Sequence, residues 1–169
     1  GHRERSATVA VEGLAPTANL VVPSTANEGD TVWMSLSSAY DPSTADTDAG
    51  FSYRFSCDAG STFSAWGASS SFGCATENDI NLSVVAAIAD EDGLSTAYAA
   101  AVEVHNIAPS ATFVAPSLID EGSTYVLALA SATDPSSVDT ALGFEYQFTC
   151  DPAPWQPGEA HLLKRARQG

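Results

Sequence analysis

The feature that most constrains this sequence is an internal repeat with a constant offset of 93 residues. The segment Phe51–Asp58 returns as Phe144–Asp151, and Leu14–Ala18 returns as Ile107–Ala111. The matched stretch needs no gaps. A period of this length is too long for the stacked units of a solenoid. It fits tandem independent modules of roughly 90–100 residues, the size of an immunoglobulin-like sandwich.

The offset also sets the domain boundaries that we expect. Residues 1–13 are interpreted as the last strand of a preceding module plus a linker, because Ser6–Val11 aligns with Ala99–Val104. Residues 14–105 make one complete module, and residues 106–151 make a second module that is truncated. Residues 152–169 change to a Pro-rich and then basic composition, which predicts an irregular tail. The chain therefore reads as a fragment of a longer array.

Alternation of apolar and polar residues predicts strands throughout the modules. No window shows a convincing helical stripe, and the turn Asp90–Gly93 lies between two of the alternating segments. The segments are Ile80–Ala89, Phe51–Cys57, Val32–Leu36 with its second copy Tyr125–Leu129, and Tyr98–Val104. Short strands separated by turn signals predict an all-β fold, with immunoglobulin-like β-sandwich modules in tandem.

The order of several short sequence motifs resembles that of PKD (polycystic kidney disease type) domains. The motifs are Ala15–Ala18, Glu28-Gly29, Asp41-Pro42, Phe51–Phe55, Asp90–Gly93 and Val102–Pro109. The usual aromatic-x-Phe-Gly-Asp-Gly turn of that family is altered in this chain to the sequence Tyr53–Gly60. The resemblance covers nearly all of the first module and half of the second. It implies a seven-stranded immunoglobulin-like fold in extracellular or surface proteins, often as a spacer beside other domains, and it implies no catalysis.

The chain has three cysteines, Cys57, Cys74 and Cys150, and Cys150 is the repeat equivalent of Cys57. The equivalent of Cys74 falls at Arg167, so the third cysteine lacks its repeat partner. We expect a Cys57–Cys74 disulfide that stabilises the first module by roughly 3 kcal/mol and implies an oxidising compartment. The alternatives are two buried free thiols in a cytosolic protein, or a zinc site, for which no histidine has ligand spacing.

Charge and histidine content exclude several classes of function. With 21 acidic and 6 basic residues, the net charge of −15 disfavours binding to nucleic acid or to an anionic membrane surface. Apolar runs such as Val84–Ala89 are too short to insert into a bilayer. His105 is the one histidine in the body of the chain, and a Ser-His-Asp site needs more than a linker histidine. A glycosidase-type carboxylate pair is conceivable, but acids that recur at turns in both modules favour a structural role. The chain is therefore not expected to be an enzyme.

Acidic loops gather at two places in the expected sandwich topology. At one end we place Asp41, Asp46, Asp48, Asp90, Glu91 and Asp92. At the junction between modules we place Glu28, Asp30, Asp58, Glu77, Asp79, Asp134 and Asp139. Calcium takes six to eight oxygen ligands, largely carboxylates and carbonyls. We hypothesise that Ca²⁺, the one cofactor considered, binds at one of these places and rigidifies the array; the alternative is a solvated acidic face that maintains solubility.

Two tryptophans are candidate binding residues. Trp33 lies on the outward phase of its strand and Trp66 lies in a Ser/Gly-rich stretch, so together they could form a sugar-stacking platform. The alternative is partial burial under a neighbouring loop. The predicted function is a non-catalytic extracellular spacer and adhesion module of a larger secreted or surface protein, with neighbouring domains and an extracellular glycan or protein as partners. The second hypothesis is a carbohydrate- or protein-binding accessory domain of a secreted hydrolase.

Overall fold

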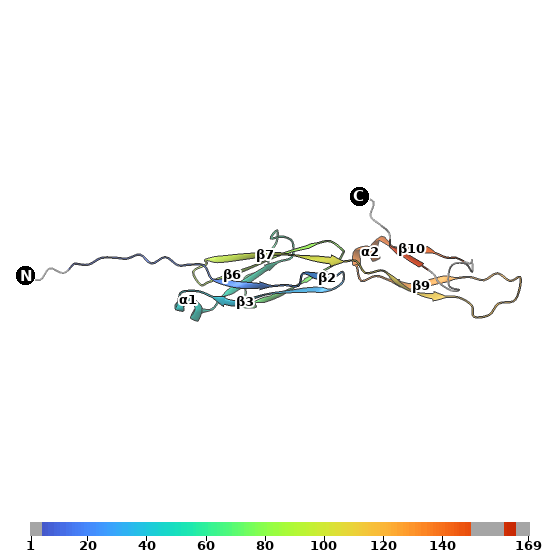
Figure 1. The fold of residues 1–169 in the computed structure, drawn as a ribbon, viewed down its shortest axis with the longest axis horizontal. Coiled ribbons are helices and arrows are strands. Elements are labelled where there is room, and N and C mark those ends of the chain that lie inside the picture. The colour runs from blue at the N-terminus through green and yellow to red at the C-terminus, as the bar shows by residue number, and fades with distance from the viewer. Residues whose placement is uncertain (1–4, 150–160, 165–169) are drawn as a thin grey trace, which may run out of the picture. The chain divides into compact units, whose positions relative to one another are not determined.

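The computed structural model describes residues 5–149 and 161–164 (Figure 1). Strands dominate these residues, and the predicted all-β, immunoglobulin-like fold is confirmed. Two six-residue helices, α1 (Thr44–Ala49) and α2 (Ser137–Leu142), are exceptions that the periodicity did not predict. Neither helix is long enough to display a 3.6-residue stripe, which is why the pattern missed them. Within the described residues, no helix has the length and apolar content that crossing a membrane requires.

Residues 17–105 form two sheets. The three-stranded sheet has the order β1-β3-β5, with β1 at Thr17–Val21, β3 at Thr31–Tyr40 and β5 at Ser71–Ala75. The four-stranded sheet has the order β2-β7-β6-β4, with β2 at Thr25–Asn27, β7 at Ser95–His105, β6 at Leu82–Ala89 and β4 at Ser52–Ser56. β2 runs parallel to β7, whereas β4 and β6 are antiparallel. The predicted strands over Phe51–Cys57 and Ile80–Ala89 are therefore present, each slightly shorter than expected.

The core follows the alternation in the sequence. Val32, Met34 and Leu36 of β3 are each 3 % exposed or less, whereas Trp33 between them is 65 % exposed. Val84, Ala86 and Ile88 of β6 are all 0 % exposed. Each large apolar side chain removed from water stabilises the fold by about 1.5–3 kcal/mol. The buried side chains of β3 and β6 therefore stabilise the first repeat.

The predicted disulfide is present, because Cys57 and Cys74 are bonded to each other. Cys57 directly follows β4 and Cys74 lies in β5, so the bond joins a strand of the four-stranded sheet to one of the three-stranded sheet. Cys74 is 1 % exposed, which places the bond in the core. The alternatives, free thiols or a zinc site at this pair, are therefore excluded. Cys150 lies outside the described residues.

The second repeat copies the first at the level of backbone pairing. Its antiparallel strands are β8 (Ser110–Val114) and β9 (Ala128–Thr133). Their pairing register is that of β1 with β3 displaced by 93 residues, including the irregularity at the start of the first strand. Ser38 and Ser131, also 93 residues apart, both have a φ of 54°. The equivalence between the two segments thus extends from sequence to conformation.

Three segments differ from what the sequence predicted. β9 begins at Ala128 rather than at Tyr125, and Tyr125 is 45 % exposed. Residues 5–16 contain no helix or strand, so the strand expected at Ser6–Val11 is not formed in this chain. His161–Lys164, placed by the prediction in an irregular tail, forms strand β11, which pairs with β10 (Phe144–Gln147). The exposed backbone of an unpaired strand is a template for such pairing.

Contacts divide the chain into two compact units. The first unit contains the residues up to Pro23, Trp33–Gly73 and Ser83–Ala101. The second unit contains Ser24–Val32, Cys74–Leu82 and the described residues from Val102 onward. The domain boundaries inferred from the repeat stay a prediction.

Candidate metal centres

The loop that carries α1 fixes two carboxylates in buried positions. The backbone N–H of Ser43 donates to Oδ1 of Asp41 at 2.8 Å, and the N–H of Asp46 donates to Oγ of Ser43 at 3.3 Å. Short polar side chains at a helix N-cap accept such bonds readily. Gly50 ends the helix with a φ of 86°, a conformation that favours glycine. Asp41 and Asp46 are 3 % and 7 % exposed, so the loop holds both carboxylates inside.

A third carboxylate comes from the turn after β6. Asp90 is 7 % exposed, and its Oδ1 accepts the backbone N–H of Leu94 at 2.9 Å. Asp41, Asp46 and Asp90 each bring one ligand oxygen within 4.8 Å of the others. All three lie in the first unit. We call them the first cluster.

The first cluster is a subset of the residues predicted for this end of the sandwich. The structure brings together Asp41, Asp46 and Asp90, whereas the side chains of Asp48, Glu91 and Asp92 are exposed. The sequence could not separate these two groups, because both stand in short acidic loops. Burial distinguishes them, and burial depends on how α1 and the turn fold.

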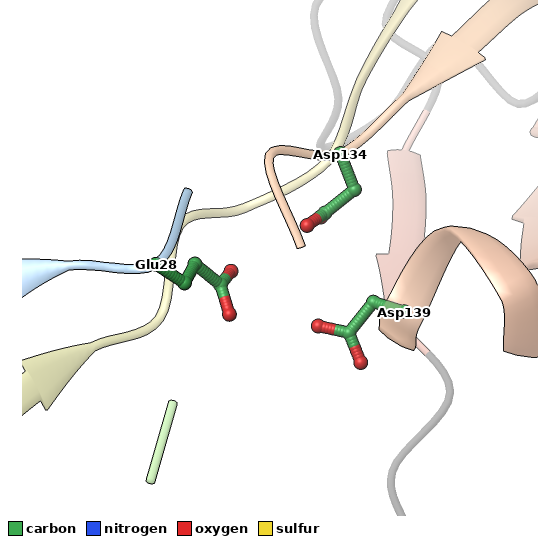
Figure 2. Close-up of side chains that lie close together, drawn as sticks. All are labelled: Glu28, Asp134 and Asp139. Atoms are coloured by element: carbon green, nitrogen blue, oxygen red, sulfur yellow. The ribbon is translucent and has the colours of Figure 1, made fainter. Parts of the chain in front are cut away.

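A second cluster contains Glu28, Asp134 and Asp139, whose ligand oxygens also lie within 4.8 Å of one another. Figure 2 shows the three carboxylates directed toward a common space, with Asp139 on α2. Glu28 is 2 % exposed and its Oε1 accepts the backbone N–H of Ile107 at 2.8 Å. All of these residues belong to the second unit. The predicted junction set therefore contributes three of its members.

The loop around α2 has the same hydrogen bonds as the loop around α1. Ser136 N–H donates to Oδ1 of Asp134 at 2.9 Å, and Asp139 N–H donates to Oγ of Ser136 at 3.1 Å. Gly143 ends the helix with a φ of 83°. The pair Asp134 and Asp139 is thus the structural counterpart of Asp41 and Asp46. What differs is the residue that supplies the third carboxylate.

The other junction residues have different partners. Oδ1 and Oδ2 of Asp58 accept hydrogen bonds of 2.6 Å from the hydroxyls of Ser56 and Thr62, respectively, and these bonds, that of Ser56 foremost, lower the pKa of Asp58 to about 2. Oδ2 of Asp30 accepts the N–H of Asn27 at 3.0 Å. The backbone carbonyl of Glu77 accepts the hydroxyl of Ser136 at 2.8 Å. Asp79 is exposed. The side chains of Asp58 and Asp30 therefore stabilise their own turns through these hydrogen bonds.

Of the two candidate tryptophans, Trp33 lies in a strand and Trp66 lies in a loop. Trp33 lies in β3 of the three-stranded sheet. Trp66 is 41 % exposed and precedes Gly67, which bridges to β4 of the four-stranded sheet. The guanidinium of Arg54 stacks 4.5 Å from the ring centroid of Trp66 and 4.4 Å from that of Phe63. A cation–π contact of this kind already occupies part of the Trp66 surface. A platform that combines both tryptophans stays a prediction.

A shallow pocket lies beside Trp66, and His105 lies beside Glu103. The pocket has a volume of about 180 Å³ and is lined by Ser52, Trp66, Ala89, Asp90 and Gly93. Nδ1 of His105, whose side chain is half exposed, lies 3.9 Å from Oε1 of Glu103. His105 is the last residue of strand β7, so the exposed linker position expected from the sequence is a strand end.

One of the solved structures similar to this chain is the PKD domain of an M14-like peptidase from Thermoplasmatales archaeon SCGC AB-540-F20. The two chains are 16 % identical with a TM-score of 0.44, over 55 % of this chain and 98 % of that chain. No family model matches the sequence, and no curated protein matches it.

Proposed function

We propose that this chain is a non-catalytic part of an extracellular protein, in which sandwich repeats serve as a stiff spacer. The observation that carries the proposal is the anchoring of the connection between the repeats. The Glu28 carboxylate accepts the N–H of Ile107, which belongs to that connection. The N–H of Glu28 in turn donates to the carbonyl of His105 at 3.0 Å. Opening such buried hydrogen bonds has a free-energy cost, so the connection resists bending.

Close packing at Gly29 supports the same interpretation. A Cβ atom on Gly29 would lie 2.7 Å from Cβ of Pro135 and 3.1 Å from its carbonyl oxygen. The Gly29 N–H also donates to the carbonyl of Thr76 at 2.6 Å. The turn of the first repeat therefore fits against the Asp134–Ser136 segment with no room for a side chain. A connection held this way keeps its geometry, as a spacer requires.

The extracellular part of the proposal rests on the disulfide. Disulfides form and persist in oxidising compartments and are rare in the cytosol. The Cys57–Cys74 bond lies in the core, where it stabilises the first repeat. The strongly acidic charge would further favour solubility outside the cell.

The test compares two glycines that are equivalent in the repeat. Gly29 and Gly122 have φ values of 82° and 80°, so alanine is strained at both, by about 1 kcal/mol. Only at Gly29 would the new methyl group collide with Pro135, because nothing lies within 4 Å of a Cβ at Gly122. We expect Gly29→Ala to accelerate hydrogen exchange of the Ile107 amide at least tenfold, measured by NMR, while Gly122→Ala leaves that amide protected. Equal exchange in the two variants would contradict a stiff connection.

The pocket beside Trp66 favours the second function, a glycan- or protein-binding accessory domain. A ligand site usually combines an aromatic or apolar surface with a few polar groups, as this recess does with Trp66, Ser52 and Asp90. Retention of the chain on a glycan array, lost in Trp66→Ala and kept in Trp33→Ala, would support binding at this pocket. If both variants are retained on the array as the wild type is, the glycan does not bind at this pocket.

A further inference from the structure

The first cluster is a group of buried negative charges without a cation. Asp41, Asp46 and Asp90 are all more than nine-tenths buried. Among the described residues, no Lys, Arg or His pairs with these three carboxylates. Arg54, the one basic residue in the body of the chain, is stacked on Phe63 and Trp66 instead. Buried carboxylates close together repel one another, so this arrangement needs a compensating charge.

Individual oxygen atoms in the cluster lack donors. Oδ2 of Asp41 and Oδ2 of Asp90 are buried and have no hydrogen-bond partner. The other oxygen of each carboxylate accepts a backbone N–H, from Ser43 and from Leu94, which fixes its orientation. A buried polar atom without a partner carries its full desolvation penalty. Two oriented oxygens in that condition point to a ligand that binds oxygen.

We propose that Asp41, Asp46 and Asp90 form a binding site for one calcium ion. The donor set consists of carboxylate oxygens alone, which suits a hard cation rather than zinc or copper. The three carboxylates supply at least one oxygen each, and water or backbone carbonyls can complete the six to eight that calcium takes. Calcium accepts this irregular geometry, whereas magnesium demands a near-ideal octahedron and gives up its water reluctantly. The ion replaces mutual repulsion with attraction to a shared positive charge.

The site ties together two segments that are distant in the sequence. Asp41 and Asp46 come from the loop around α1, and Asp90 comes from the turn after β6. Calcium would therefore fasten this loop to the turn at one end of the first unit. This stabilisation is independent of the connection at Ile107, so the proposed spacer function and the calcium site can fail separately.

The experiment is a calorimetric titration of the whole chain with CaCl₂ at pH 7, paired with thermal melting in EDTA and in calcium. We expect a dissociation constant on the order of 10⁻⁴–10⁻³ M, as in extracellular modules. At ten times that concentration, the melting temperature should rise by roughly 5–10 °C. Asp90→Asn should weaken the binding roughly tenfold or more and remove most of the shift. Because the second cluster can contribute its own heat, the site is measured as the difference between the wild type and Asp90→Asn.

Matched controls come from the exposed acids of the same two loops. Asp48→Asn and Asp92→Asn each remove one negative charge near the site and should leave both the affinity and the shift unchanged, since both side chains are exposed. Melting in EDTA shows whether each variant folds, and Asp90→Asn should melt there no lower than the wild type because a repulsion is removed. The proposal is overturned if calcium produces neither heat nor a shift, or if Asp90→Asn binds as tightly as the wild type. Equal affinity for MgCl₂ would overturn the assignment to calcium.

Discussion

The loops around α1 and α2 share one local design but differ in their third carboxylate. In each loop, an aspartate accepts the N–H of a serine two residues later, and that serine caps a six-residue helix. The first loop meets Asp90, from the turn after β6. The second meets Glu28, from the turn after β2. The comparison shows that the local structure of the loop is the same in both repeats. The third carboxylate determines which other segment lies close to the loop.

The two copies of the Glu-Gly turn also differ in the segments that they contact. Glu28 is 2 % exposed, its carboxylate accepts the N–H of Ile107, and Asp134 and Asp139 lie close to it. Its repeat equivalent, Glu121, is exposed. Identical residues thus have different environments in the two repeats. Local sequence sets the turn, and the contact partner sets the burial.

The largest expected effect comes from removing the disulfide of the first repeat. The Cys57–Cys74 bond joins the two sheets of residues 17–105, while β8 and β9 contain no disulfide. The double variant Cys57→Ser/Cys74→Ser should lower the free energy of unfolding of the first repeat by about 3 kcal/mol. Urea unfolding measures that loss, and hydrogen exchange resolves it by segment. If β8 and β9 lose protection as much as β3 and β6 do, the two regions are not separable in this way.

A smaller effect separates the two capping serines. Ser43→Ala removes one cap bond and should destabilise by about 1 kcal/mol. Ser136 is fully buried and also donates to the carbonyl of Glu77, so Ser136→Ala should cost about 2 kcal/mol. Chemical unfolding of the two variants measures the difference.

The control for the serines is a pair of threonines in the same loops. The hydroxyl of Thr47 donates to the carbonyl of Asp41, and that of Thr140 donates to the carbonyl of Asp134, both at 3.3 Å. Thr47 also donates to the carbonyl of Ser43 at 3.0 Å. Both threonines are exposed, so Thr47→Ala and Thr140→Ala should both have small costs, with that of Thr47→Ala no lower. A Ser43 variant as damaging as the Ser136 variant would contradict the idea that the second loop is tied to a further segment.

Much of the fold was predictable because the alternation of apolar and polar residues along a strand indicates which side chains are buried. The inward phase of β3, the strand β6 and the disulfide all follow from residue type and spacing, as at Val32 and Met34. The acidic loops were predictable as groups, since acids at turns are visible in any sequence. The choice of Asp41, Asp46 and Asp90 over Asp48, Glu91 and Asp92 was not. It depends on short helices without a periodic signal and on contacts between segments far apart in the chain.

The close contact between Gly29 and Pro135 could not be predicted from the sequence either, because it joins segments far apart in the chain. Its turn shows only that a glycine with positive φ is needed, and Gly122 satisfies that need equally. The contact with Pro135 is a tertiary event. Likewise, the pairing of β11 with β10 depends on an available strand edge rather than on the composition of His161–Lys164.

The smallest expected effect concerns Asp58, a carboxylate stabilised by donors instead of a cation. Hydrogen bonds from Ser56 and Thr62 hold the pKa of Asp58 at about 2, below the ordinary value near 4. Because the folded-state pKa is depressed, the stabilisation is present above about pH 4 and is lost as the pH falls toward 2. Asp58→Asn should therefore flatten this part of the pH profile, only slightly, since water screens an exposed group. Thermal melts between pH 5 and pH 2 measure the flattening.

Asp58 also provides a contrast to the first cluster with respect to calcium. Both of its oxygens already accept hydrogen bonds, whereas Oδ2 of Asp41 and Oδ2 of Asp90 accept none. The melting temperature of Asp58→Asn should therefore respond to calcium as the wild type does, while that of Asp90→Asn should not. A calcium response that Asp58→Asn abolishes would mean that the acidic surface as a whole, rather than three buried carboxylates, attracts the ion.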